Sequence, residues 1–290
     1  MVAAVRPQRR RHRGLGAHSA KLPRIAVRAR GPPRAGHADG RDGEGPRRRR
    51  VGDAGHADRP PVEEHVRRLH EGPVDAKEAH VTIASLTVKD GPQLAAGARS
   101  TCYRWLATAF SFPNSELITA ITSGAGEEEW RNAAQNLPFE LPPDEEFEAT
   151  VEGLEEGYIG VFEVGPGRPF CALYEGSHRS GRMKLMEDIV RFYGHFGLLT
   201  APEDQPDHLC AELDFMHYMS FKETAVLAHG DSADDLRRAQ RDFLDRHLCQ
   251  WLPRFLKRLE SSDRAPDFYR RQAVRAVEFC RRDLVWLKEM

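Results

Sequence analysis

The sequence predicts an all-α protein: a single helical-bundle domain of about seven or more helices over residues 92–290, preceded by a basic tail (1–73) and a linker (74–91). Three observations lead to this prediction. Apolar residues recur at three- to four-residue spacing through most of the domain, as in amphipathic helices. No stretch alternates apolar and polar residues between hairpin turns, which argues against strands. The tail contains no Phe, Trp, Tyr or Cys, so it cannot offset its ordering entropy and is expected to be disordered.

Each expected helix is defined by one apolar stripe. The stripes run over residues 94–110, 147–162, 186–196, 206–228, 236–248, 251–259 and 267–287. Pro113 is expected to close the first helix and Gly197 the third, because both residue types end helices readily. Pro206 and Asp207 are expected to begin the fourth helix. A proline in the first turn loses no needed N–H, and an aspartate side chain can accept hydrogen bonds from the unpaired N–H groups there.

Charge divides the chain into two parts. Residues 1–73 hold 18 Lys+Arg against 8 Asp+Glu, whereas the whole chain holds 43 against 44. Residues 74–290 therefore hold 25 against 36. The near-neutral total conceals a tail with a net charge of +10 joined to a body with a net charge of −11.

Three interpretations of the Arg-, Pro- and Gly-rich tail remain open. Its arginine runs, residues 9–11 and 47–50, could contact nucleic-acid phosphates. It could be a targeting sequence, although no apolar stretch of about 7–15 residues follows the arginines, as a secretory signal requires. It could also be translation of GC-rich DNA upstream of a mis-assigned start, with Val74 encoded by a GTG start codon.

Composition limits the class of protein further. The five cysteines are widely spaced and form no CxxC pair, so neither a zinc site nor a disulfide framework is expected. No apolar run approaches the roughly 18 residues of a membrane helix. We therefore expect a cytoplasmic protein with no cofactor of its own and no membrane or nucleic-acid partner, either monomeric or homodimeric.

A polar cluster is expected at the start of the fourth helix. Leu209, Leu213 and Met216 recur at helical spacing and face the core. His208 and Glu212, four residues apart, share the next face near the positive end of the helix dipole. This arrangement suits the capture of a polar or charged ligand.

The segment between the second and third helices, residues 163–175, mixes turn-forming residues with large apolar side chains. Gly165-Pro166-Gly167 allows a tight turn with positive φ. Phe170, Leu173 and Tyr174 would then draw the segment back onto the body. We expect an ordered loop, which serves either as a buried connector or as part of a binding site.

Several motifs occur together in the order of a known family. YIGVFEVGPG (158–167), followed by Pro169 and LYE (173–175), resembles the loop motif of the TorD/DmsD/NarJ family of redox-enzyme maturation chaperones. The second signature and the C-terminal pattern of that family are matched by PDHL (206–209), ELDFM (212–216), Phe243, HL (247–248), WLP (251–253) and PDFY (266–269). The resemblance covers about residues 92–290. It is closest to the branch that serves type II dimethyl-sulfoxide-reductase-like molybdoenzymes.

The resemblance implies a cytoplasmic, TorD-like helical accessory protein that is not an enzyme. Such proteins bind the twin-arginine signal peptide or the apo form of a molybdoenzyme catalytic subunit. They hold this client back from export until its molybdenum cofactor has been inserted. The client-binding residues implied by the family motifs are Tyr158, Phe162, Pro169, Tyr174, Glu175, Pro206, Asp207, His208 and Glu212.

The acidic residues suit the arginine pair of such a peptide. Two guanidinium groups call for carboxylates in fork geometry. We hypothesise that Asp207 and Glu212 clamp the arginines, with Glu175 and Asp214 as further candidates. The net charge of −11 on the body would steer a basic peptide towards it.

The apolar residues suit the stretch that follows the arginines. We hypothesise that Tyr158, Phe162 and Tyr174 capture this stretch in an aromatic groove. His208 would form a hydrogen bond to the client or sense pH.

Two other functions stay open. His208 and Glu212 have the i, i+4 spacing of metal ligands, as in a helical metal-dependent enzyme, but His217 leaves that face. The sequence contains no HExxH, nucleophile elbow or P-loop. A nucleic-acid-binding protein would instead use the basic tail, and its binding would weaken steeply with salt.

Overall fold

The computed structural model describes residues 26–27, 91–144, 150–164, 167–200 and 205–290. The described residues confirm the predicted all-α class, because their regular elements are helices apart from two strands of two residues each. Most of the tail and linker lies outside the described residues, as does the start of the expected turn at Gly165-Pro166. The predictions of a disordered tail and a linker are therefore not tested.

The elements follow one another along the chain as strand β1, then helices α2 to α5, a π-helical turn, two more helices, strand β2 and four final helices. Their bounds are β1 (Ala26–Val27), α2 (Gly91–Ala109), α3 (Ser115–Thr122), α4 (Ala125–Ala134), α5 (Leu154–Tyr158), η2 (Ile159–Glu163), α6 (Glu175–His178), α7 (Arg182–His195), β2 (Leu198–Leu199), α8 (Leu209–Ala228), α9 (Asp234–Arg246), α10 (Leu248–Glu260) and α11 (Asp267–Glu289).

The helix boundaries depart from the predicted stripes in several places. Within its described residues, 150–162, the second stripe becomes helical only at Leu154, after Gly153 takes a positive φ of 71°. The fifth stripe is broken at His247, whose φ of −120° and ψ of −96° separate α9 from α10. Helices α3 and α4 have no counterpart among the predicted stripes, because their apolar faces are short.

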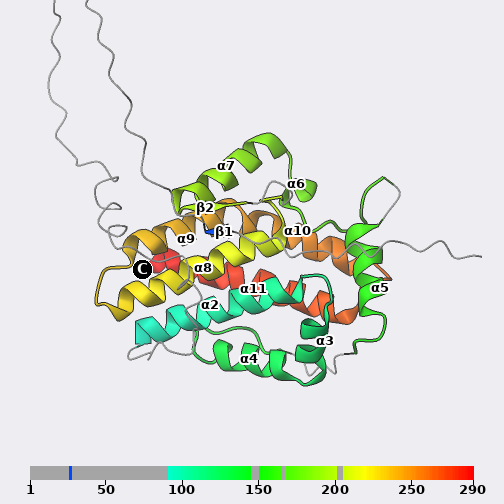
Figure 1. Ribbon diagram of the computed structural model, residues 1–290, viewed down its shortest axis with the longest axis horizontal. Helices are drawn as coiled ribbons and strands as arrows, with labels where there is room; N and C mark the ends of the chain where they lie inside the picture. Colours follow the sequence, from blue (N-terminus) through cyan, green and yellow to red (C-terminus); the bar gives the residue numbers. More distant parts are fainter. Residues whose placement is uncertain (1–25, 28–90, 145–149, 165–166, 201–204) are drawn as a thin grey trace, which may run out of the picture. The chain divides into compact units, whose positions relative to one another are not determined.

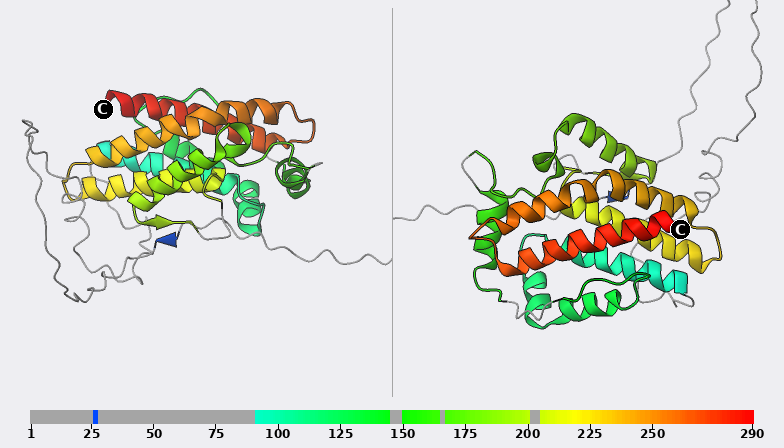
Figure 2. Two further views of the ribbon diagram at one scale, coloured as in Figure 1. Left: turned by 90° about the horizontal axis from the view of Figure 1, so that it is seen from above. Right: turned by 180° about the vertical axis from the view of Figure 1, so that it is seen from behind.

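The long helices α2, α8, α9, α10 and α11 pack against one another around a shared core. In Figure 1, α7 lies on one side of these helices, and α3 and α4 lie on the other. The right view of Figure 2 shows the same arrangement from behind, with α10 and α11 in front. The core is rich in aromatic side chains, of which Tyr103, Phe110, Phe215, Phe243 and Phe255 are fully buried.

Among the described helices, none has both the length and the apolar character needed to cross a membrane.

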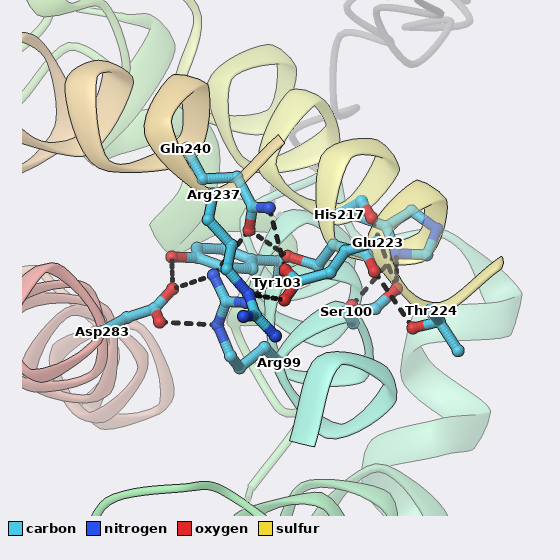
Figure 3. Close-up of polar contacts among 10 residues, drawn as sticks. Arg99, Ser100, Tyr103, His217, Glu223, Thr224, Arg237, Gln240 and Asp283 are labelled. Carbon is cyan, nitrogen blue, oxygen red and sulfur yellow. Dashed lines mark hydrogen bonds and ion pairs between the residues drawn. The ribbon is translucent and has the colours of Figure 1, made fainter. Parts of the chain in front are cut away.

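A buried arginine joins four of the long helices. Arg99 of α2 has no exposed surface, and its Nε and Nη2 donate to the Asp283 carboxylate of α11 at 2.6 and 3.1 Å. Its Nη1 donates to Glu223 Oε2 of α8 at 2.8 Å, and Nη2 also donates to Gln240 Oε1 of α9 at 2.5 Å. Figure 3 shows the guanidinium between these partners. One side chain thus sets the relative positions of α2, α8, α9 and α11.

The partners of Arg99 are themselves held by further hydrogen bonds. Tyr103 donates its hydroxyl to Asp283 Oδ2 at 2.6 Å, and Arg237 donates Nε to Glu223 Oε1 at 2.6 Å. Burial raises the pKa of Glu223, but the positive charge of Arg99 and the hydrogen bonds from Arg237 and Gln240 together outweigh burial, so the net pKa is lowered. Buried charges are tolerated in a protein core when they are paired and hydrogen-bonded in this way.

Replacing Arg99 should therefore destabilise the fold strongly. In Arg99→Met, Asp283 and Glu223 keep their charges in the core without the guanidinium that neutralised them. We expect a loss of about 3–5 kcal/mol in the free energy of unfolding, measured by urea denaturation followed by circular dichroism.

The matched control is Arg104→Met on the same helix. Arg104 pairs with Glu129 at the surface, where 45% of its side chain is exposed, so its loss should cost less than about 1 kcal/mol. Equal losses for the two variants would contradict the central role of Arg99.

Candidate functional site

The structure brings the two predicted motif segments together in one seam. The Glu175 N–H donates to the Asp207 carbonyl at 2.9 Å, and the Leu209 N–H donates to the Leu173 carbonyl at 2.8 Å. Between these bonds, Tyr174 and His208 form an isolated antiparallel bridge. We call residues 173–176 and 206–209 the seam. It lies where α6 meets the start of α8 and contains five of the nine predicted site residues.

The start of α8 differs from the prediction. The helix begins at Leu209 rather than at Pro206, and its N-cap is His208, whose Nδ1 accepts the Cys210 N–H at 3.2 Å. Asp207 does not cap the helix. It faces the other strand of the seam, where its Oδ2 accepts the Gly176 N–H at 3.0 Å. The reason is that Pro206 and Asp207 lie in a turn, closed by the His208 N–H donating to the Gln205 carbonyl at 3.1 Å, and that His208 then pairs with Tyr174 before the helix starts.

Asp207 is fully buried but only partly satisfied. Its Oδ1 has no hydrogen-bond partner among the residues that the structure describes. Burial raises the pKa of Asp207, although the Gly176 N–H and the nearby Arg182 act in the opposite direction. Pro206 beside it is also buried, and its carbonyl accepts the Tyr193 hydroxyl of α7 at 3.0 Å.

Glu175 connects the seam to the break between α9 and α10. Its Oε2 lies 2.9 Å from His247 Nδ1, and its Oε1 accepts from Arg179 one turn further along. His247 Nε2 lies 3.3 Å from Asp188 Oδ2 of α7. The carboxylate of Glu175 has no exposed surface, so its role in this conformation is to hold α6 on the body.

Glu212 lies on α8 one turn after the seam and is also fully buried. Its Oε2 accepts the Trp251 Nε1–H of α10 at 3.1 Å. Burial raises the pKa of Glu212 well above its ordinary value, and the negative charge of Glu175 raises it further. The other oxygen of Glu212, Oε1, has no hydrogen-bond partner among the described residues.

His208 is neutral near pH 7. Burial lowers its pKa to about 4, and its ring lies edge-to-face with Tyr174 at a centroid distance of 5.0 Å. This lowered pKa does not favour pH sensing by His208 near pH 7, and the role stays a prediction. Its contacts are those of a helix cap and an aromatic partner.

Two of the three residues predicted to line the aromatic groove are not at the surface. Tyr158 and Phe162 lie in the core, where Phe162 contacts the rings of Phe110, Phe255 and Tyr269. Both are under 5% exposed. They are unavailable to a client unless the core opens, so their assignment to apolar capture is not supported by their positions.

Other apolar residues of the loop are exposed instead. Val164 is 60% exposed and Phe170 is 38% exposed, with Pro169 half-buried beside Phe170. The Arg258 guanidinium of α10 lies over the Phe170 ring, 5.1 Å from its centroid, and donates to the Phe170 carbonyl. Tyr174 is half-buried. Val164 and Phe170 are thus the exposed apolar residues in the described part of the loop before the seam.

Two residues of the seam's surroundings were not assigned to the site from the sequence. His247 and Trp251 appeared only as part of the C-terminal pattern, yet they contact Glu175 and Glu212 respectively. Helical periodicity assigns both of them to the core, as their burial confirms. The available signal was that a histidine and an indole N–H on a buried face require polar partners.

The described residues lend no support to a metal site at His208 and Glu212. No group of three or more His, Cys, Asp and Glu side chains among them is arranged to hold a metal ion. His208 Nδ1 is occupied by the α8 cap, and Glu212 by Trp251.

Asp214, a further candidate carboxylate, lies on α8 away from the seam and is partly buried. Burial raises its pKa from 3.8 to about 7. Near neutral pH it is therefore only partly ionised, which weakens it as a partner for an arginine.

Comparison with known proteins matches residues 122–257 to the family described as the nitrate reductase delta subunit. The chain is 43% identical over 120 residues to the selenate reductase assembly chaperone protein of Thauera selenatis, which covers 40% of this chain and 62% of that protein. It is 33% identical over 181 residues to the chlorate reductase assembly chaperone protein of Ideonella dechloratans, covering 61% of this chain and 82% of that protein.

A third relative is the dimethyl sulfide dehydrogenase assembly chaperone protein of Rhodovulum sulfidophilum, 37% identical over 169 residues. The chain thus spans less than two thirds of the selenate reductase relative and most of the chlorate reductase relative. All three relatives carry the same kind of description, that of an assembly chaperone.

The Trp251–Glu212 hydrogen bond should contribute measurably to stability. Trp251→Phe keeps an aromatic ring in the core but removes the indole N–H, which leaves Glu212 Oε2 buried without its donor. We expect a loss of about 1–3 kcal/mol in the free energy of unfolding. In a chain that already carries Glu212→Leu, Trp251→Phe should lower the free energy of unfolding clearly less. Equal losses with and without Glu212→Leu would show that the hydrogen bond contributes nothing to stability.

Asp214 should make stability fall as pH rises. Because its pKa is raised in the folded state, the folded protein binds the proton more tightly, and this advantage is complete below pH 3.8 and is lost as pH rises through about 7. Asp214 should make the free energy of unfolding fall by up to about 1.4 kcal/mol for each pH unit. Urea unfolding between pH 5 and 8 measures this decrease, and Asp214→Asn should abolish the part that Asp214 contributes. The control variant Asp242→Asn, at the exposed surface, should keep the same pH dependence as the unsubstituted chain.

Proposed function

The chain belongs to the nitrate reductase delta subunit family, which includes the assembly chaperones of the TorD type, and from this membership we propose that it is a system-specific maturation chaperone for a molybdoenzyme. The membership confirms the resemblance of its motifs to the TorD/DmsD/NarJ chaperones. We propose that the client is a catalytic subunit, bound through its twin-arginine signal peptide or as the apoprotein. The chaperone would hold this client until its molybdenum cofactor is inserted.

The observation that carries the proposal is the seam itself. Both motif segments converge there, and Asp207, Glu175 and Glu212 gather around it although they come from different elements. A cluster of buried carboxyl groups is costly to maintain, and the free Oδ1 of Asp207 is an acceptor with no partner among the described residues. An arginine of the client would supply the missing donor in charge-assisted form.

The carboxyl groups are not exposed in this conformation. A client arginine would reach Asp207 only if the strand of the seam around Tyr174 moves aside. That strand is held by a few backbone hydrogen bonds and by Glu175, and such contacts can be exchanged for contacts with a peptide. Client binding would therefore be coupled to opening of the seam.

The apolar stretch of a signal peptide would lie over the exposed loop residues. Val164 and Phe170 are exposed and precede the first segment of the seam in the sequence. Tyr174 lies between Phe170 and Glu175 in the sequence. The net charge of −11 over residues 74–290 would speed the encounter with a basic peptide and make it sensitive to salt.

The remaining features of the proposal follow from the family role. The protein would act in the cytoplasm, where the client waits for its cofactor before export. It would have no catalytic activity and no cofactor of its own, since the molybdenum cofactor belongs to the client. It would act as a monomer or homodimer.

The deciding experiment is calorimetric titration of the full chain with twin-arginine signal peptides of molybdoenzymes encoded beside its gene. Binding that is lost when both arginines become alanine would support the proposal and identify the client. A lysine pair in place of the arginines should bind more weakly, since lysine lacks the planar fork. Absence of binding to every peptide and to the apoenzymes would overturn it.

Asp207→Asn should weaken binding without unfolding the chaperone. The asparagine oxygen can still accept the Gly176 N–H, so the seam is retained, but the negative charge is lost. We expect roughly 10- to 100-fold weaker peptide binding, measured by the same titration, with an unchanged unfolding transition.

The matched control is Glu187→Gln, which removes one negative charge from the exposed face of α7, where Glu187 pairs with Arg191. It should change binding only slightly. If both variants weakened binding equally, Asp207 would act through net charge alone and the clamp would be disproved.

A further inference from the structure

The outer face of α10 carries three positive charges. Arg254, Lys257 and Arg258 are all exposed and lie three or four residues apart along the helix, so their side chains share one face. We call these three residues the basic face. The right view of Figure 2 shows α10 at the front of the molecule, with no other described helix drawn over it. The basic face is therefore accessible to a partner.

The basic face differs from the two helices that pack beside it. Both α9 and α11 contact α10. Every arginine and lysine of α9 forms an ion pair with a carboxylate, and so does every one of α11. None of the three cations of α10 forms an ion pair with a residue that the structure describes. Unpaired cations are thus a property of α10 and not of the surrounding surface.

The two arginines of the basic face are held by the loop instead. Arg254 Nη1 donates to the His178 carbonyl at 3.1 Å. Arg258 Nε donates to the Phe170 carbonyl, and its guanidinium lies over the Phe170 ring, 5.1 Å from the centroid. A carbonyl is neutral, so these bonds restrain each guanidinium without compensating its charge. Such restraint lowers the entropy that a side chain loses when it binds a partner.

An apolar group lies directly beside these charges. The Phe170 side chain is 38% exposed although the Arg258 guanidinium covers part of its ring. Arg168, two residues earlier in the loop, is also exposed and forms no ion pair with a described residue. The surface therefore offers positive charges together with one accessible aromatic ring.

We propose that the basic face of α10, together with Phe170, is a docking site for a short acidic segment of a partner protein that carries an aromatic side chain among its carboxylates. The carboxylates would accept charge-assisted hydrogen bonds from the two guanidinium groups. The aromatic side chain would pack on Phe170. This proposal does not rest on the proposed function, because its ligand is opposite in charge to a twin-arginine peptide.

The charge of the whole body favours a short segment over an anionic membrane. Residues 74–290 carry a net charge of −11, and an anionic bilayer would place many negative charges against that acidic surface. A short peptide contacts only the basic face. Screening limits its repulsion from the rest of the body to distances of about 8 Å at physiological ionic strength.

The test measures binding of a fluorescent peptide of sequence EDEFEDE to the full chain by fluorescence anisotropy. Lys257→Glu reverses one charge of the basic face. The Lys257 side chain is exposed and forms no hydrogen bond or ion pair with a described residue, so the fold should be retained. The peptide should bind this variant roughly tenfold more weakly than the unsubstituted chain. A peptide with alanine in place of phenylalanine should also bind more weakly.

The matched control is Arg131→Glu on α4. Arg131 is likewise exposed and without an ion pair among the described residues, and the substitution changes the net charge by the same amount. It should alter the affinity less than about twofold.

Three results would overturn the proposal. Equal weakening by the two variants would show that net charge alone sets the affinity. Absence of peptide binding to a chain with an unchanged circular dichroism spectrum would remove the site. Sedimentation of the chain with phosphatidylglycerol vesicles, lost in Lys257→Glu and not accompanied by peptide binding, would assign the basic face to lipid. None of these results depends on the binding of a signal peptide at the seam.

Discussion

The packing of this protein depends on the buried guanidinium of Arg99. It is held by Asp283, Glu223 and Gln240, which come from three other helices. Because the geometry of a guanidinium is rigid and directional, these bonds set the positions of four helices relative to one another. Without Arg99, Asp283 would lose its guanidinium partner inside the core, and Glu223 would keep only that of Arg237.

This constraint reaches the candidate site through α8. Glu223 anchors the later part of α8 to Arg99, and Glu212 anchors its first part to Trp251 of α10. With α8 held at both points, its N-terminus is presented at a defined place. There the cap residue His208 pairs with Tyr174. The seam is therefore a consequence of the core rather than an independent loop feature.

The helical class and most stripes were predictable, because burial of one helix face leaves a periodic pattern in the sequence. The seam was predicted only in part. The two segments were identified as one functional region by their resemblance to a chaperone family, not by spacing. Their residues were then assigned an exposed role, whereas Asp207, Glu175 and Glu212 are buried.

The sequence by itself determined the local properties of this protein: which stretches form helices, which side chains face a core, and which family the motifs resemble. Only the tertiary structure decided which polar groups are partnered. Arg99 and Asp283, like Glu175 and His247, lie far apart in the sequence and meet only in the folded chain. Helical periodicity repeats every few residues and carries no information about such contacts. Exposure, pKa and hydrogen bonding depend on these contacts, so they could be read only from the fold.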